Sequence, residues 1–426
     1  MKRVKITLFA LLICLPLTVS VCLALSLKDI KLVTFLSLTA GLTAYSLMAI
    51  NIFLATRMKV VEALCGGLDK TYFAHKYIGI AVTCLLLFHF NFTANAGGLK
   101  APGDIQSKAI LTGNVAFWTA MAFIAVSFIK RFPKISNDLI KYHLWKRIHK
   151  LMPVVFLAAT FHQQFVKVPF SSNSPAGEFL TGMIILGVFS VFFTWIAPYF
   201  RQRKYRVVKK TIIGEVSQLL IEPLDKPISN YRPGQFCFIR AVNKSNLKEP
   251  HPFTISEYTD TGQIQLCISS AGDFTNTVLT SLNESDLVYI EGGYGNFSHK
   301  TCEANQIWIA GGIGITPFLS FLGELDHRSS QKVHLFYSVK DEENIIGLEK
   351  LKLANKKYEN FNFTVNASKK TGRLTAEKVR SIAGFDVEKT ELFFCGPEGL
   401  RKSIIDGLNQ LQSKSIRVHY EKFEFR

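Results

Sequence analysis

The sequence predicts an α-helical membrane part with six spans, fused to an antiparallel β-barrel and then to an α/β domain of Rossmann-like type. Two observations predict this order. Six uncharged, apolar runs lie within the first 200 residues, most of them near the ~20 residues that a membrane-spanning helix needs. After Phe200 the apolar runs are short and charges are frequent, as in a soluble protein. A chain of 426 residues is long enough for two or three domains.

The six apolar runs are the candidates for the membrane spans. The N-terminal run also resembles a secretory signal, but it is longer than a usual signal core, lacks an A-x-A site and is followed by five more runs. The fifth run has 16 uncharged residues, and Trp145 to His149 would extend it at the membrane interface. The runs cover residues 6–27, 32–56, 77–99, 109–129, 151–166 and 179–200.

Basic residues, lysine and arginine, are frequent in every second loop between these runs and rare in the others. Seven lie between the fourth and fifth runs, whereas only Lys100 and Lys108 lie between the third and fourth. The positive-inside rule therefore predicts that both termini and the whole soluble half are cytoplasmic. This topology accounts for much of the net charge of +18, and no motif indicates nucleic-acid binding. The eight cysteines contain no C-x-x-C pair, which excludes structural zinc and thioredoxin-type sites of that kind.

Four histidines lie in two of the apolar runs. "HKYIGIAVTCLLLFH" extends from His75 to His89, and "HKLMPVVFLAATFH" extends from His149 to His162. An ionisable residue inside a membrane is costly and by default functional. Because both runs cross in the same direction, His75 and His149 are expected near the cytoplasmic face. His89 and His162 are expected near the outer face, about 21 Å away.

Two facing imidazoles at each of two levels predict the iron ligands of two bis-imidazole haem b groups. The alternatives are hydrogen bonds to neighbouring helices, or a zinc or proton-relay site, which the distance between levels and the lack of carboxylates disfavour. In a regular helix, His75 and His89 lie on the same face. The 13-residue step from His149 to His162 would instead turn the second side chain about 140° away from the first. Pro153 lies between them, so we expect a distortion there.

The sequence around the inner histidines resembles a known superfamily. "GGLDKTYFAHKYIGI" and "YHLWKRIHKLMPVVF" are similar to the loop-plus-helix starts of the ferric reductase and NADPH oxidase superfamily, and the unequal spacings favour the NADPH oxidase branch, including its bacterial members. The resemblance implies a haem b membrane domain over 1–203, an FAD-binding barrel over 204–303 and an NAD(P)-binding α/β domain over 304–426.

Three segments in order indicate the flavin domain: "RPGQFCFIR" (232–240), "HPFTIS" (251–256) and "ISSAGDFTNTVL" (268–279). Short alternating strands between turn residues predict an antiparallel barrel. "HPFTIS" resembles the flavin motif of the ferredoxin-NADP reductase superfamily, which implies that the hydroxyl of Thr254 lies near the reactive flavin nitrogen. Backbone amides of "AGDFT" are suited to the FAD pyrophosphate. The implied FAD-binding residues are His251, Pro252, Phe253, Thr254, Ser256, Gly272, Phe274 and Thr275.

"IWIAGGIGITPFLSFL" (307–322) predicts a buried parallel strand, a glycine turn and a helix that begins at Thr316–Pro317 and is suited to a pyrophosphate. Together with "LFFCGPEGL" (392–400) it resembles the nicotinamide domain of the same superfamily. The resemblance implies that Thr316 contacts the carboxamide and that Cys395 lies beside the hydride path, although a packed strand-end thiol is the alternative. The implied nucleotide-binding residues are Gly311, Gly312, Gly314, Thr316, Pro317, Gly396 and Pro397.

"HLFYSVKDEENI" (334–345) contains the strand expected to meet the adenosine ribose. Ser338 and Lys340, with help from Arg373, are suited to a 2′-phosphate and favour NADPH. Asp341 is suited to a ribose hydroxyl, so NADH stays open.

The chain ends in "HYEKFEFR". The resemblance implies an aromatic residue stacked on the flavin, which is Phe425 by preference over Phe423, and an acidic residue, Glu421, near the nicotinamide. The predicted catalytic residues are therefore Thr254, Cys395, Glu421 and Phe425.

The resemblance implies an NAD(P)H oxidoreductase that sends electrons through FAD and two haems to an extracytoplasmic small molecule. Dioxygen, giving superoxide, is the favoured acceptor. A ferric chelate, a periplasmic partner protein and a non-catalytic haem-binding scaffold are the alternatives. No histidine lies between His162 and His251, so the further histidine that eukaryotic oxidases carry near the oxygen site is not identified. The sequence predicts no oligomeric state.

Overall fold

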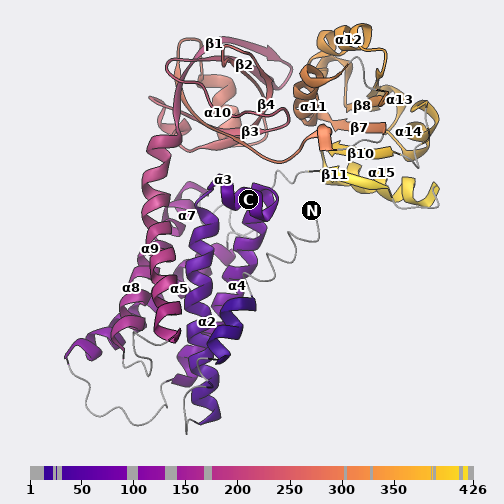
Figure 1. Cartoon of the computed structure of the whole chain (residues 1–426). Helices are drawn as coiled ribbons and strands as arrows, with labels where there is room; N and C mark the ends of the chain where they lie inside the picture. Colours follow the sequence, from indigo (N-terminus) through magenta and orange to yellow (C-terminus); the bar gives the residue numbers. More distant parts are fainter. Residues whose placement is uncertain are drawn as a thin grey trace. The chain divides into compact units, whose positions relative to one another are not determined.

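The computed structural model describes residues 14–22, 25, 31–93, 104–129, 142–166, 175–301, 305–326, 330–384, 386, 390–411 and 416–420. The chain divides into two compact units, Met1–Pro198 and Tyr199–Arg426 (Figure 1).

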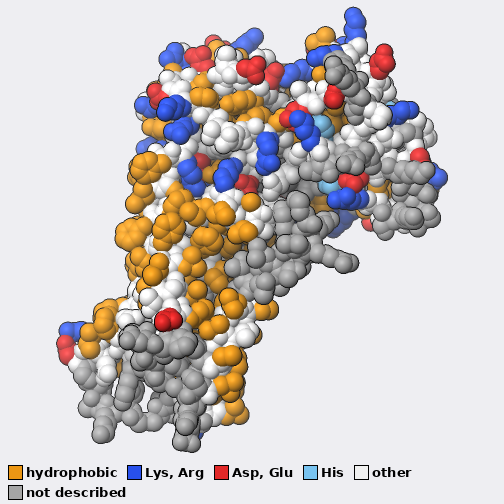
Figure 2. Space-filling model, viewed as in Figure 1, with side chains coloured by type: hydrophobic (Ala, Val, Ile, Leu, Met, Phe, Trp, Pro, Cys, Tyr) orange, Lys and Arg blue, Asp and Glu red, His pale blue; other side chains and the backbone are white. Residues whose placement is uncertain are grey.

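The first unit is helical. Four of its helices are long and apolar enough to cross a membrane, and Figure 2 shows hydrophobic side chains over much of the visible face of this unit. The first predicted run lies largely outside the described residues, and the fifth forms two short helices, so four of the six predicted spans are found in the described part. The helices are α2 (Leu32–Ala55), α3 (Lys59–Cys65), α4 (Leu68–Thr93), α5 (Asp104–Ile129), α7 (Tyr142–His149), α8 (Met152–Phe165) and α9 (Pro175–Arg201).

These helices pack in pairs, with α2 along α4 and α5 along α8. The buried ring of Phe156 on α8 stacks on Tyr45 of α2, with ring centroids 5.3 Å apart. The Tyr45 hydroxyl forms a hydrogen bond of 3.0 Å with Thr160 Oγ1. A Cβ atom at Gly187 of α9 would lie 2.1 Å from Phe156 Cζ, so the glycine allows α9 to approach α8 closely.

The predicted distortion near Pro153 is confirmed. Helix α7 ends at His149, and α8 begins at Met152 with Pro153 in its first turn. Pro153 lacks an N–H group, which the first turn of a helix does not need. The break places His149 at the end of one helix and His162 inside the next.

The second unit begins with a closed barrel whose strands are all paired antiparallel, as predicted. The order around the barrel is β1-β2-β5-β4-β3-β6, and the apolar core inside it includes Tyr205, Ile255 and Ile290. One helix, α10 (Asp273–Ser281), follows β5. The strands are β1 (Arg203–Ile213), β2 (Val216–Pro223), β3 (Phe236–Ala241), β4 (His251–Tyr258), β5 (Ile264–Ser269) and β6 (Leu287–Tyr294).

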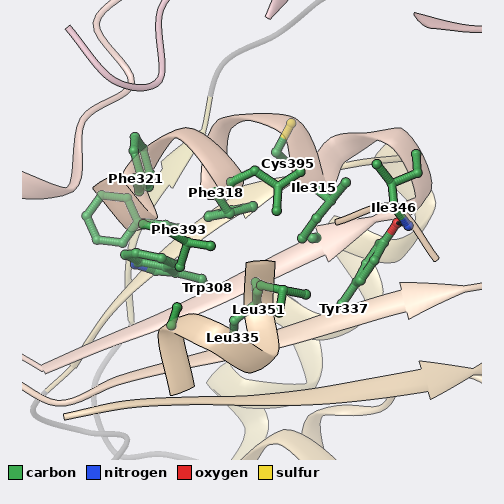
Figure 3. Close-up of a cluster of buried hydrophobic side chains, with 14 of the residues drawn as sticks. Trp308, Ile315, Phe318, Phe321, Leu335, Tyr337, Ile346, Leu351, Phe393 and Cys395 are labelled. Atoms are coloured by element: carbon green, nitrogen blue, oxygen red, sulfur yellow. Dashed lines mark hydrogen bonds between the residues drawn. The ribbon is translucent and has the colours of Figure 1, made fainter. Parts of the chain in front are cut away.

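The rest of the unit is a parallel sheet in the order β11-β10-β7-β8-β9. Separate apolar clusters cover its two faces, and Figure 3 shows the cluster around Trp308, in which Phe318 and Phe321 of α11 pack against the sheet. The elements are β7 (Asn305–Gly311), α11 (Thr316–Phe321), β8 (Val333–Val339), α12 (Leu348–Lys357), β9 (Phe361–Ala367), α13 (Ser368–Thr371), α14 (Ala376–Ile382), β10 (Thr390–Cys395), α15 (Glu398–Leu411) and β11 (Arg417–Tyr420).

His299 is a buried titratable side chain beside this cluster. Its ring lies against Trp308 and Phe321, with centroids 5.5 Å and 4.9 Å away. Burial, reinforced by the charge of Lys300, lowers the pKa of His299 to about 4. The ring is therefore neutral at pH 7, and its approach to Glu324, 3.8 Å from Nε2, is not an ion pair there.

Acid is expected to destabilise the second unit through His299. Below the ordinary pKa of 6.5 the unfolded chain binds a proton that the folded chain does not bind until about pH 4. The resulting loss of folding stability is absent above pH 6.5 and grows as the pH falls, reaching roughly 2 kcal/mol at pH 5. Unfolding of the purified protein at pH 7 and pH 5 measures it. His299→Met should lose less stability between these pH values than the wild type, and equal losses would contradict the assignment.

Candidate functional site

The inner pair of predicted haem ligands is brought together. The rings of His75 on α4 and His149 at the end of α7 lie 5.9 Å apart, at an angle of 76°. His75 Nδ1 lies 3.0 Å from the carbonyl oxygen of Asn51 on α2. A carbonyl only accepts hydrogen bonds, so Nδ1 carries the proton and the lone pair of a neutral ring is on Nε2. The ring of His149 stacks on Trp145, one turn earlier in α7, at 5.4 Å.

The two outer histidines make the same kind of carbonyl contact as His75. His89 Nδ1 lies 2.9 Å from the carbonyl oxygen of Ser37 on α2. His162 Nδ1 lies 2.9 Å from the carbonyl oxygen of Ala109 on α5. Three of the four predicted ligands thus have the same tautomer, set by a helix carbonyl.

Two glycines that the sequence analysis did not single out make room for the outer rings. Gly41 and Gly113 each follow an accepting residue by four positions, where the helical N–H group points at the same carbonyl. A Cβ atom at Gly41 would lie 2.7 Å from His89 Nδ1, and one at Gly113 would lie 2.3 Å from His162 Nδ1. Only glycine at these positions leaves the imidazole a path to the carbonyl.

These donors fit a haem iron better than a metal ion held by protein ligands alone. Two imidazoles bound on opposite sides of one metal, with bonds of about 2 Å, have ring centres roughly 6 Å apart, which the His75–His149 separation matches. Among the described residues, no group of three or more His, Cys, Asp or Glu side chains is placed to hold a metal ion. Pairs of neutral imidazoles are the ligands of a macrocycle that supplies its own equatorial nitrogens.

The flavin motif forms strand β4. The ring of His251 stacks on Phe274 at a centroid distance of 3.8 Å, and Phe253 lies 6.2 Å from the same ring. Thr254 is buried. Ser256 is also buried, and its hydroxyl donates to the carbonyl oxygen of Gln265 on β5, so this predicted FAD residue is bonded within the barrel wall.

The start of α10 meets β4 through Phe274. The hydroxyl oxygen of Thr275 accepts hydrogen bonds from the amides of Ala271 and Gly272, at 2.8 Å and 3.0 Å. The Thr275 side chain therefore shapes the turn, and the amides of the first helical turn remain the anion-binding groups that a helix start offers. Because β3 also pairs with β4, all three flavin segments are adjacent in space.

The two nucleotide motifs contact each other through their backbones. Strands β7 and β10 are neighbours, and Ala310 pairs with Cys395 where both strands end. A Cβ atom at Gly314 would lie 2.2 Å from the carbonyl oxygen of Cys395. Gly396 has a φ of +156°, and its Cβ would lie 2.9 Å from Gly311 Cα. Gly311, Gly314 and Gly396 are required by this contact, which lies at the carboxyl edge where open α/β sheets bind ligands.

The remaining nicotinamide residues lie close by. Thr316 and Pro317 are buried in the first turn of α11, and the Thr316 hydroxyl donates to the carbonyl oxygen of Ile313. Cys395 is buried in the cluster of Figure 3 beside Ile315. Gly312 has a φ of +55°, and a Cβ there would meet no atom within 4 Å.

The predicted adenosine end contains more charge than expected. Ser338, the last residue but one of β8, lies opposite Gly311. Lys340 is exposed and, through its carbonyl, accepts a hydrogen bond from the amide of Lys369. The Lys369 side chain forms an ion pair of 2.9 Å with Asp341.

Lys370 forms a similar pair with Glu342. The sequence analysis missed these two lysines, which come close because β8 and β9 are parallel neighbours. Arg373 is exposed in the turn after α13. Glu421, Phe423 and Phe425 lie outside the described residues, which end at Tyr420.

Three family models match this chain in succession. Residues 40–160 match a ferric reductase like transmembrane component. Residues 205–316 match an FAD-binding domain, and residues 308–405 match an oxidoreductase NAD-binding domain.

Curated relatives match parts of the chain. The heavy chain of a superoxide-generating NADPH oxidase of Dictyostelium discoideum is 22% identical, over 57% of this chain and 62% of that protein. A mitochondrial ferric reduction oxidase 8 of Arabidopsis thaliana is 34% identical, over 28% of this chain and 18% of that protein. A flavohemoprotein of Chromobacterium violaceum is 24% identical, over 52% and 60%. The chain spans less than two thirds of the length of each of these three relatives.

Gly314→Ala tests the contact between the nucleotide motifs. The new methyl group overlaps the Cys395 carbonyl, so we expect a loss of roughly 1–3 kcal/mol in the stability of the second unit. Gly399→Ala in α15 is the matched control, since a Cβ there meets nothing within 4 Å. Thermal unfolding of both variants measures the effect, and equal melting temperatures would show that the contact is not close.

The matches follow the order of the units described above: helices with histidine pairs, a barrel with the flavin motif, and a sheet whose two glycine motifs touch. The chain thus combines a ferric reductase like transmembrane component with an FAD-binding domain and an oxidoreductase NAD-binding domain, and an NADPH oxidase and a ferric reduction oxidase are among its relatives.

Proposed function

We propose that this protein is a transmembrane oxidoreductase that takes electrons from cytoplasmic NAD(P)H, passes them through FAD and two haem b groups, and delivers them to dioxygen outside the membrane as superoxide. When bound, FAD accepts a hydride and releases its electrons singly, and each haem carries one electron at a time. One observation carries the proposal. Three imidazoles are hydrogen-bonded to helix carbonyls in a chain that also contains the flavin motif and two nucleotide motifs in contact with each other.

His75 with His149, and His89 with His162, would hold the irons of the two proposed haems. A hydrogen bond from Nδ1 to a helix carbonyl keeps the lone pair on Nε2, orients the ring and raises its basicity as a ligand. For His75, His89 and His162 this is the bond that the described residues make. For His149, the stack on Trp145 orients the ring, and the Trp145 indole N–H is itself held by Ser127 Oγ at 3.0 Å.

In the second unit, we assign FAD to the region 204–303 and the nucleotide to 304–426. His251, Phe253 and Thr254 would line the flavin, while the first turn of α10 would receive its pyrophosphate. The ring stack of His251 on Phe274 supports this assignment, because it holds the start of β4 beside the start of α10.

Thr316 and Cys395 would flank the nicotinamide, at the edge where the two glycine motifs meet. NADPH is the preferred nucleotide, because Lys340 after β8 and Arg373 after α13 are both exposed and would favour a 2′-phosphate. Asp341, the residue suited to NADH, is already paired with Lys369. Phe425 and Glu421 are proposed for the flavin face and the nicotinamide.

The membrane part, assigned to 1–203, would have six spans with both termini in the cytoplasm, in a plasma or bacterial inner membrane. The basic residues of alternate loops support this orientation. A potential that is negative inside would assist each outward electron by about 2.3 kcal/mol per 100 mV.

Ferric-chelate reduction is the second candidate function. The Arabidopsis relative named as a ferric reduction oxidase is 34% identical over the part that it matches, which favours keeping this acceptor. Both functions require the same path through the membrane and differ only at its outer end.

One assay compares the candidates. Purified protein with FAD and NADPH is expected to reduce cytochrome c in a manner that superoxide dismutase abolishes. A ferric chelate replaces oxygen as the substrate under anaerobic conditions, and NADH runs in parallel. Reduction of the chelate alone would replace superoxide production with the second candidate, and oxidation of neither nucleotide would refute both.

Gly113→Ala tests the outer haem site. Its methyl group would lie 2.3 Å from His162 Nδ1 and displace the ring from its carbonyl. Haem content, measured by the pyridine haemochrome method, should fall from about two towards one per chain while FAD binding is kept. Gly182→Ala on α9 is the control, because nothing lies within 4 Å of a Cβ there. Full haem content in Gly113→Ala would contradict the assignment of His162, and Gly41→Ala repeats the test at His89.

A further inference from the structure

The strand that carries the flavin motif is joined to the helix that follows the glycine turn by a chain of hydrogen bonds. Tyr231, which precedes β3, and Ser320 of α11 have their hydroxyl oxygens 2.5 Å apart. The amide of Gly234 donates to Ser320 Oγ at 3.1 Å. The Tyr231 hydroxyl also donates to the carbonyl oxygen of Ile255 on β4 at 3.3 Å.

The donor and acceptor in each of these hydrogen bonds follow from the groups at the two ends of the series. The amide of Gly234 only donates, and the carbonyl of Ile255 only accepts. Tyr231 uses its single proton towards Ile255, so Ser320 must donate to Tyr231. Burial raises the pKa of Tyr231 well above its usual value, so its hydroxyl stays protonated at every physiological pH.

Each end of this series of hydrogen bonds lies close to a residue that takes part in the proposed reaction. Ile255 directly follows Thr254, and its own amide donates to the carbonyl oxygen of Gln235, which holds this part of β4 in place. Ser320 lies four residues after Thr316, about one helical turn, and therefore on nearly the same face of α11. A shift of Ser320 moves Thr316 with it, because both belong to one short buried helix.

The turn between the two sites has no room to absorb a shift. Gly234 has a φ of +89°, and a Cβ there would lie 2.1 Å from the Phe297 carbonyl oxygen and 2.5 Å from the Phe321 ring. The backbone that donates to Ser320 is thus already packed against α11. The two hydroxyl groups between β4 and α11 add directional hydrogen bonds to this packing.

We propose that Tyr231 and Ser320 are positioning residues for hydride transfer, which hold the nicotinamide-binding turn against the flavin-binding strand. This inference rests on the proposed function. Neither hydroxyl contacts the reacting atoms. Their effect is on distance, and a misplacement of about 1 Å in such a transfer costs on the order of 100-fold in rate.

A neighbouring tyrosine provides a matched control. Tyr258 stacks on Tyr231 with ring centroids 4.7 Å apart, and its hydroxyl donates to the carbonyl oxygen of Ile228 at 2.9 Å. Tyr258→Phe therefore removes a hydroxyl from the same part of the barrel without removing a hydrogen bond to α11.

The test is stopped-flow reduction of the FAD-loaded, full-length protein by NADPH without oxygen. Tyr231→Phe and Ser320→Ala should each lower the limiting rate of flavin bleaching by roughly tenfold. FAD affinity and haem content should not change. The primary deuterium isotope effect should rise, because hydride transfer becomes more rate-limiting. The double variant should be little slower than either single variant, since both remove the same link, and Tyr258→Phe should behave as wild type.

Three outcomes would overturn the inference. The first is a wild-type bleaching rate in both variants. The second is a loss of FAD affinity that accounts for the slower rate, which would make the link a support of the barrel only. The third is a wild-type protein that binds FAD but is reduced by neither NADPH nor NADH. Only this last result also removes the proposed function, so the two failures are distinguishable.

Discussion

The membrane unit depends on the hydrogen bonds between histidine Nδ1 atoms and helix carbonyls. An imidazole in an apolar interior must satisfy both ring nitrogens, and a carbonyl at 2.9–3.0 Å satisfies one of them in His75, His89 and His162. These bonds also join α4 to α2 and α8 to α5, the pairs that pack along each other. The same contacts that build the helix bundle therefore fix the tautomer and the orientation of these three rings.

In the second unit, the edge proposed to bind the nucleotide is built from closely packed backbone rather than from charged side chains. Where β7 and β10 end, glycines bring two turns into direct contact, and a side chain at Gly314 would overlap the Cys395 carbonyl. A ligand at this edge therefore meets main-chain groups at close range. The Tyr231–Ser320 link holds the turn against β4, so the proposed flavin and nicotinamide sites depend on one packed body. In the proposed function, electrons would leave this body one at a time, which is the chemistry that FAD supplies.

Motif order and spacing predicted much of this structure. The barrel, the parallel sheet and the helix break near Pro153 were all predicted from turn residues, apolar runs and the missing proline N–H. Four of the six predicted spans are found in the described part, because α8 is short and the first run lies largely outside it.

Other features depend on which elements become neighbours, which local patterns do not reveal. Gly41 and Gly113 acquire meaning only once α2 is known to face α4 and α5 to face α8. Lys369 and Lys370 come close to Lys340 because β8 and β9 are adjacent and parallel. Ser256 matched the flavin motif, but its hydroxyl is bonded to β5.

The most direct measurement of the central claim is an optical titration of the purified, FAD-loaded protein with NADPH in the absence of oxygen. The account predicts that flavin absorbance is lost and that reduced low-spin bis-imidazole haem bands then appear, with two haems for each flavin. A colourless protein, or haem bands that stay oxidised after the flavin is fully reduced, would contradict it.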